Sequence, residues 1–114
     1  MNSKQYQIFK MDCSEGRNVL NEHFRTDYKY VAGLYLYTTS DLTDCTFSAR
    51  INGTEVLPSV PANLFTWNQS ISRNDAIWNI EDDKIEASDK LIEVELNCST
   101  NCVIYVCVLL KNPE

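Results

Sequence analysis

Cysteines are the residues whose type and spacing come nearest to chemistry in this chain of 114 residues. Cys98 and Cys102 are separated by three residues, whereas Cys13, Cys45 and Cys107 lie elsewhere. A zinc site built on the first two needs a second ligand pair; Cys13 and Cys45 are possible donors, but their spacing shows no zinc-site pattern. Cysteines in strands usually pack as small apolar side chains. We therefore expect no metal and no cofactor, and Cys98 and Cys102, which flank a turn, are candidates for a disulfide.

Residues for acid–base or nucleophilic catalysis do not form a recognisable set. His23 is the only histidine and lies in a polar segment, so a serine or cysteine nucleophile elsewhere lacks a histidine base. Acidic residues gather at Glu81, Asp82, Asp83 and Glu86, but without the spacing of a calcium-binding loop. This cluster is typical of a solvated turn, and we expect that the protein is not an enzyme.

Two tryptophans, Trp67 and Trp78, suggest binding of a carbohydrate by ring stacking. Asn68 and Gln69 follow the first of them and would supply polar neighbours. Aromatic residues in strands, however, more often belong to a core or an interface. A carbohydrate-binding module or adhesion domain is therefore the alternative function.

The elements that would position these residues are strands. Leu91 to Cys98 alternates apolar and polar residues, which is typical of a strand with one buried face. Val103 to Leu110 is apolar on both faces and needs cover on two sides. Because only the short polar turn Ser99–Asn101 separates them, the two segments are predicted to form a hairpin.

Tyr28 to Thr39 is a second strand that is apolar on both faces, and Gly33 within it suggests a bulge or the close approach of another backbone. Cys45 to Ile51 alternates and is followed by Asn52-Gly53, a strong hairpin signal. The return strand, from Glu55, should lie at a sheet edge or leave the sheet at its prolines.

Weaker signals complete the chain. Lys4 to Asp12 is a strand candidate, and Cys13 to Asp27 is irregular, with a turn of helix conceivable from Val19 to Phe24. Short strands are predicted at 76–80 and 85–87. About eight short strands separated by turns predict one all-β domain over residues 1–114, an antiparallel β-sandwich. A jelly roll fits best, with an immunoglobulin-like sandwich as the alternative.

Charge and apolar surface indicate the kind of partner. The net charge of −6 disfavours nucleic acid and anionic membranes and is compatible with a protein partner. The longest apolar run is too short to span a membrane as a helix, and no signal-peptide core is visible near the N-terminus. The second apolar faces of the two strands need cover, either by loops of the same chain or by another subunit. The residues expected at such an interface are Val31, Tyr35, Tyr37, Tyr105, Cys107 and Leu109.

The run YVAGLYLYTTSDLTDCTFSARINGTEVLPSVPANLF resembles the central sheet of small jelly-roll proteins from tailed bacteriophages. These include auxiliary capsid or head-decoration proteins and head-fibre bases of the crAss-like type, and the resemblance in pattern extends from Tyr28 to Lys111. It implies a non-enzymatic virion component, assembled in the host cytoplasm, that docks on a major capsid lattice or forms a homo-oligomer. The family has no site residues to carry over.

Overall fold

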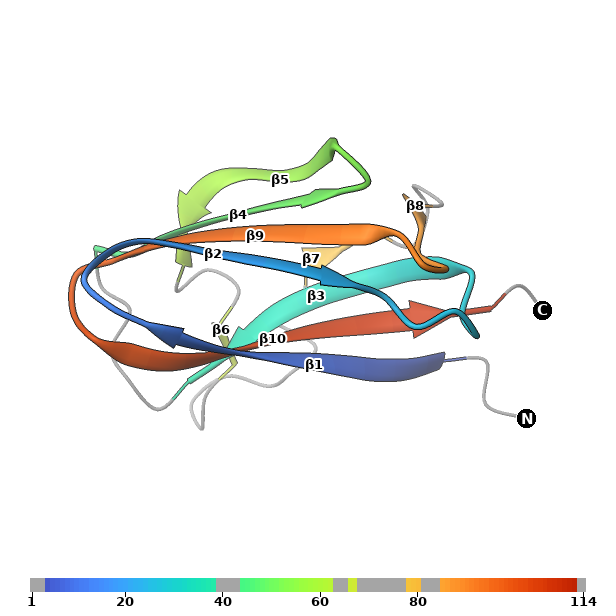
Figure 1. Ribbon diagram of the computed structural model, residues 1–114, viewed down its shortest axis with the longest axis horizontal. Helices are drawn as coiled ribbons and strands as arrows, with labels where there is room; N and C mark the ends of the chain where they lie inside the picture. The colour runs from blue at the N-terminus through green and yellow to red at the C-terminus, as the bar shows by residue number, and fades with distance from the viewer. Residues whose placement is uncertain (1–3, 39–43, 63–65, 68–77, 81–84, 113–114) are drawn as a thin grey trace.

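A computed structural model describes residues 4–38, 44–62, 66–67, 78–80 and 85–112, which form a β-sandwich (Figure 1). The long strands are β1 (Lys4–Cys13), β2 (Gly16–His23), β3 (Tyr30–Tyr37), β4 (Thr46–Ile51), β5 (Thr54–Pro61), β9 (Leu91–Cys98) and β10 (Cys102–Lys111). The short strands are β6 (Thr66–Trp67), β7 (Trp78–Asn79) and β8 (Ile85–Glu86). In this part of the chain, no helix is long and apolar enough to cross a membrane.

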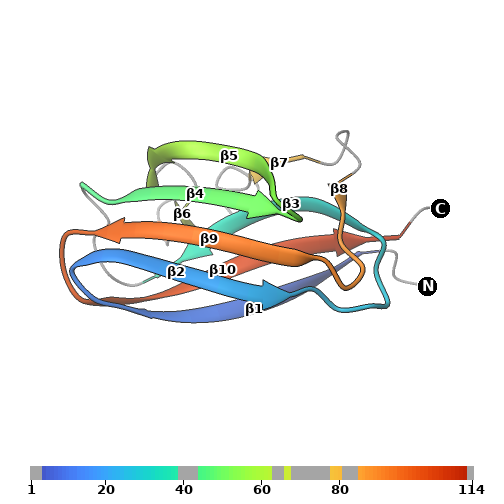
Figure 2. The same ribbon diagram turned by 45° about the horizontal axis from the view of Figure 1, so that its top comes forward.

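The strands form two sheets that face each other (Figure 2). In the first sheet the order is β1-β10-β3, with the three short strands paired to β3; in the second it is β2-β9-β4-β5. Pairing is antiparallel except between β3 and β6. Neighbours in sequence such as β1 and β2 lie in opposite sheets, which is the wrapped order of a jelly roll. The predicted all-β sandwich is confirmed.

The predicted hairpin of β9 and β10 is wrong. β9 pairs with β2 and β4, and β10 pairs with β1 and β3, so the turn at 99–101 carries the chain from one sheet to the other. Because β9 and β10 lie in different sheets, each of them has a hydrogen-bonded strand on both sides. It also lets both strands turn an apolar face toward the space between the sheets, which a single hairpin within one sheet would not provide.

β2 is a strand where the sequence predicted an irregular segment. It pairs with β9 from Gly16, opposite Cys98, to His23, opposite Leu91. Because β2 is an edge strand and most of its side chains are exposed, its sequence need not show a clear apolar alternation. Pairing to a neighbour, rather than local propensity, makes this segment extended.

The β4–β5 hairpin follows its sequence signal. Asn52 and Gly53 have φ values of 52° and 80°, and the turn that joins such strands needs positive φ at both central residues. β5 continues to Pro61 at the edge of its sheet, where a missing backbone donor costs no ladder bond on the open side.

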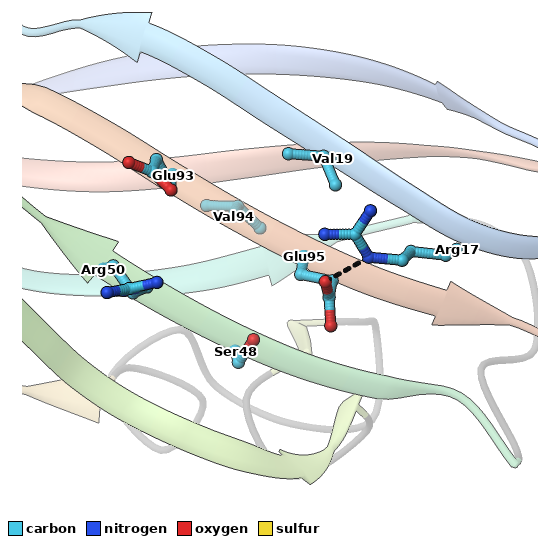
Figure 3. Close-up of a pocket in the computed structure, with 7 residues that line it drawn as sticks. All are labelled: Arg17, Val19, Ser48, Arg50, Glu93, Val94 and Glu95. Atoms are coloured by element: carbon cyan, nitrogen blue, oxygen red, sulfur yellow. Dashed lines mark hydrogen bonds and ion pairs between the residues drawn. The ribbon is translucent and has the colours of Figure 1, made fainter. Parts of the chain in front are cut away.

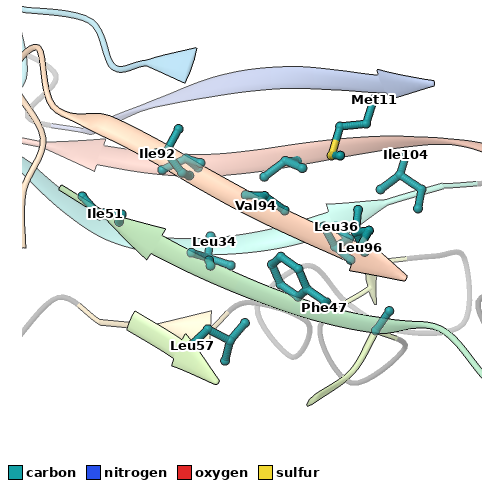
Figure 4. Packing of buried hydrophobic residues seen from close by; sticks show 14 of the residues in the cluster. Met11, Leu34, Leu36, Phe47, Ile51, Leu57, Ile92, Val94, Leu96 and Ile104 are labelled. Atoms are coloured by element: carbon teal, nitrogen blue, oxygen red, sulfur yellow. The ribbon is translucent and has the colours of Figure 1, made fainter. Parts of the chain in front are cut away.

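The core lies between the two sheets. Its largest fully buried side chains include Phe47, Leu34, Leu36, Ile92 and Ile104 (Figure 4). Each of them comes from the inward-facing row of a long strand. The alternation in β4 and β9 therefore predicted their buried faces correctly.

A bulge in β3 reverses one expected orientation. Leu109 pairs with Gly33, but the next residue, Leu110, pairs with Val31, so Ala32 is the extra residue on β3. The extra residue shifts the alternation by one position. Val31 therefore turns into the core and is 0% exposed, and its predicted place at an interface is wrong.

Candidate functional site

The outer face of the first sheet gathers aromatic and apolar side chains from three strands. We call it the aromatic face and define it by Tyr6, Ile8, Tyr35, Tyr37, Tyr105 and Cys107. In the backbone register Cys107 lies opposite both Ile8 and Tyr35, and Tyr105 lies opposite Tyr37. Residues opposite one another in a sheet share a face, so these side chains form one continuous surface.

Two members of the aromatic face are buried, although they point away from the core. Tyr35 is 4% exposed and Cys107 is 3% exposed, and they form a cluster separate from the core. The ring of Tyr6 meets Tyr35 edge-on, with centroids 5.9 Å apart. Tyr37 and Tyr105 lie 6.2 Å apart at an angle of 41°. The tyrosines thus pack on one another as aromatic pairs do in a core.

The aromatic face is hollowed at its centre. Ile8, Tyr35, Tyr37, Tyr105 and Cys107 line a depression of about 370 Å³. The Ile8 side chain at its margin is 58% exposed, the highest value among the exposed large apolar residues of the described chain. The depression offers a second molecule both an apolar floor and aromatic walls.

Sequence analysis found most of this face. Of the predicted interface residues, Tyr35, Tyr37, Tyr105 and Cys107 lie together on it, and Leu109 is half-buried beside Gly33. The contribution of β1 was missed. Tyr6 and Ile8 share a face in the period-two pattern of that strand, but the sequence does not reveal that β1 pairs with β10.

Lysines flank the aromatic face. Lys4 and Lys10 occupy the same row of β1 as Ile8, and Lys111 follows Leu109 on the outward row of β10. Lys10 lies 3.9 Å from the carboxylate of Asp12, at the end of the row. The apolar centre thus has a largely basic margin in a chain whose net charge is −6.

The outer face of the second sheet is charged. We call it the charged face and define it by Arg17, Val19, Ser48, Arg50, Glu93 and Glu95, which surround a depression of about 200 Å³ (Figure 3). Arg17 donates a hydrogen bond from Nε to the Glu95 carboxylate. The two side chains are 68% and 36% exposed, so the pair is largely solvated. The described residues that line this depression include no histidine that could serve as the base for a nucleophile.

Three cysteines meet at one end of the sandwich. We call Cys13, Cys98 and Cys102 the thiol cluster, because their Sγ atoms lie within 4.8 Å of one another. All three side chains are buried, and the cysteines are free. The predicted Cys98–Cys102 disulfide is therefore not formed in this structure. Burial raises the pKa of Cys13 and of Cys98 above the ordinary value of a thiol.

Other predicted sites lie only partly within the described residues. β6 pairs at Tyr37 through Trp67, and β7 pairs at Leu34 through Trp78, but the two tryptophan side chains lie outside what the structure describes. The acidic residues at 81–83 also lie outside the described residues. His23 is exposed, and its Nδ1 lies 3.2 Å from the backbone carbonyl oxygen of Asp89.

No family model, curated protein or solved structure matches this chain.

Proposed function

We propose that the protein is a non-enzymatic structural component of a virus particle that docks on a capsid lattice, or on copies of itself, through the aromatic face. The observation that carries the proposal is the apolar surface that this face exposes, where Ile8 is 58% exposed beside half-buried tyrosine rings. Apolar patches of this kind on a water-soluble chain usually mark interaction sites.

The composition of the aromatic face fits an interface. Tyrosine is enriched among the residues that dominate binding energy, because its ring buries a large area at little cost in rotamer entropy. An apolar centre inside a polar margin is also the usual anatomy of a protein–protein contact.

The architecture fits a repeated contact rather than a catalytic cleft. A sandwich can present the outer face of one sheet to a partner, while the charged outer face of the other sheet remains in contact with solvent. Weak contacts repeated over a regular lattice gain strength through multivalency, so each copy needs only a modest interface. The resemblance of the sequence to phage jelly-roll proteins supports the same assignment.

The test is the state of association. We expect the purified chain to sediment as an oligomer, or to co-sediment with capsid particles of its source, in a concentration-dependent manner. Ile8→Lys should weaken that association about tenfold or more, because a charge replaces the most exposed apolar side chain of the proposed interface. Val19→Lys is the matched control: Val19 is 43% exposed and lies on the charged face. Equal effects of the two variants would contradict the proposal.

Carbohydrate binding is the second candidate. It is favoured by the tilted rings of Tyr37 and Tyr105, which line the depression of about 370 Å³ and could stack on a sugar. A monodisperse monomer that binds glycans on an array, and loses them on Tyr105→Ala, would favour this function over assembly.

A further inference from the structure

The thiol cluster lies at the end of the sandwich where the β1–β2 turn and the β9–β10 turn carry the chain from one sheet to the other. Cys13 is the last residue of β1 and pairs in register with Cys102, the first residue of β10. Cys98 is the last residue of β9 in the opposite sheet. In Figure 1 the β1–β2 turn and the β9–β10 turn lie side by side at this end. The cluster therefore bridges the two layers.

The distances suit ligation of one ion. Zinc–sulfur bonds of about 2.3 Å place tetrahedral ligands about 3.8 Å from one another. The three Sγ atoms already lie within 4.8 Å of one another, so small side-chain rotations would bring them into range. Because no disulfide uses any of these sulfurs, all three are available.

Polar contacts hold the surrounding turns in place. The Glu15 backbone N–H donates to the Asn101 side-chain oxygen at 3.1 Å, which ties the β1–β2 turn to the β9–β10 turn. Asn18 closes the first turn: its Oδ1 accepts from the Ser14 N–H at 3.0 Å, and its Nδ2 donates to the Ser14 carbonyl at 2.8 Å. Such support pre-organises a ligand set.

We propose that Cys13, Cys98 and Cys102 bind one thiophilic d10 cation, Zn²⁺ or Cu⁺, as a three-thiolate site. Each thiol releases its proton to solvent and forms one sulfur–metal bond, so three protons leave and no electron is transferred. With Zn²⁺ a water molecule completes a tetrahedron, whereas three thiolates alone satisfy Cu⁺. Soft sulfur ligands select these ions over Mg²⁺ or Ca²⁺.

Ligation would fasten the two sheets to each other. The ion would link β1 and β10 of the first sheet to β9 of the second at this end of the core. Because the three ligands come together only on folding, binding stabilises the folded chain in proportion to the logarithm of the free metal concentration. Free cysteines that merely fill space as apolar side chains would give no such dependence.

The experiment is a titration of the reduced, metal-free, full-length protein with Zn²⁺, and separately with Cu⁺ under anaerobic conditions. Native mass spectrometry should find one ion per chain, and the melting temperature should rise with that ion. Co²⁺ used in place of Zn²⁺ should produce the intense sulfur-to-metal absorption of a thiolate complex. The arm that saturates at the lower metal concentration identifies the ion, and failure of both ions to bind overturns the proposal.

Variants locate the site. Cys13→Ser, Cys98→Ser and Cys102→Ser should each lower the affinity on the order of 100-fold or more, since even loss of an outer-shell partner costs 10- to 100-fold. Cys107→Ser is the matched control, because this buried cysteine lies on the aromatic face. An equal loss in the control would overturn the assignment.

A second measurement uses the unaltered chain, in case a serine variant fails to fold. Bound metal should slow alkylation of the thiol cluster and leave the rates at Cys45 and Cys107 unchanged, as read by peptide mass mapping. Uniform protection of all five cysteines, or a disulfide within the cluster in protein that binds no ion once reduced, would contradict the metal site.

Discussion

On the outer face of the β2-β9-β4-β5 sheet, Glu93 and Glu95 stand between Arg17 and Arg50, whereas the outer face of the β1-β10-β3 sheet carries packed tyrosines around Cys107. Both sheets bury their inner faces in the same core. The difference therefore does not arise from the fold, which needs only one apolar face per sheet. We propose that one outer face is adapted to water and the other to contact.

The two long strands that follow each other along the chain carry this difference. On β9, polar residues alternate with the buried Ile92 and Val94. On β10, the outward positions hold Tyr105, Cys107 and Leu109. Apolar side chains on an outer face promote aggregation unless a partner or another part of the chain covers them. We infer that its retention reflects a function, and three substitution experiments test the contrast between the faces.

The largest effect is expected at Tyr35. Tyr35→Ala should lower the free energy of unfolding by about 3 kcal/mol, because truncation of a buried aromatic ring leaves a cavity. Tyr35 is 4% exposed even though it lies on an outer face. Ser48→Ala, at a half-buried position of the charged face, should change the stability by less than about 0.5 kcal/mol. Urea unfolding of both variants measures the contrast, and a cost at Tyr35 no greater than at Ser48 would remove it.

A smaller effect is expected between two rings of the aromatic face. Tyr37 and Tyr105 lie opposite each other in register, with ring centroids 6.2 Å apart. A double-mutant cycle with alanine at both positions should give a coupling of about 1 kcal/mol. Because the contact involves no net charge, the coupling should be the same at low and high salt. A coupling near zero would mean that the rings are neighbours without a packing contribution.

Local sequence signals predicted the elements of this fold better than their pairing. The alternation in β4 and β9 and the Asn52-Gly53 turn act over a few residues, and each was found. The hairpin of β9 and β10 was wrong because strand pairing is decided by the whole sandwich. The edge strand β2 was missed because an edge position demands little apolar patterning.

The prediction of site residues was also limited to what local sequence signals can show, without the strand pairing. Val31 was misplaced because the bulge at Ala32 shifts the alternation by one residue, and a sequence pattern alone does not locate the bulge. The thiol cluster was not predicted: Cys13 was considered as a possible ligand beside Cys98 and Cys102, but it lies far from them in sequence and joins them only through β1–β10 pairing. The spacing of ligands along the sequence reveals a site that one loop forms. It does not reveal a site whose ligands come from the ends of three separate strands.

The smallest effect is expected on the charged face, at the ion pair of Arg17 and Glu95. Their side chains are 68% and 36% exposed, so solvent screens their attraction and ordering two long side chains offsets part of it. A double-mutant cycle should give a coupling of about 0.5 kcal/mol in low salt.

High salt should remove most of that coupling, because exposed charges are screened over a few ångströms at about 1 M ionic strength. The pair of Arg17 and Glu93 serves as control. Arg17 lies opposite Asn97 on β9, and Glu93 lies four residues along β9 from Asn97. The coupling between Arg17 and Glu93 should therefore be close to zero. A coupling at Arg17–Glu95 that is large and insensitive to salt would mean that these charges are desolvated. The charged face would then resemble a contact surface as much as the aromatic face does, and the choice of Ile8 over Val19 as the interface residue would lose its basis.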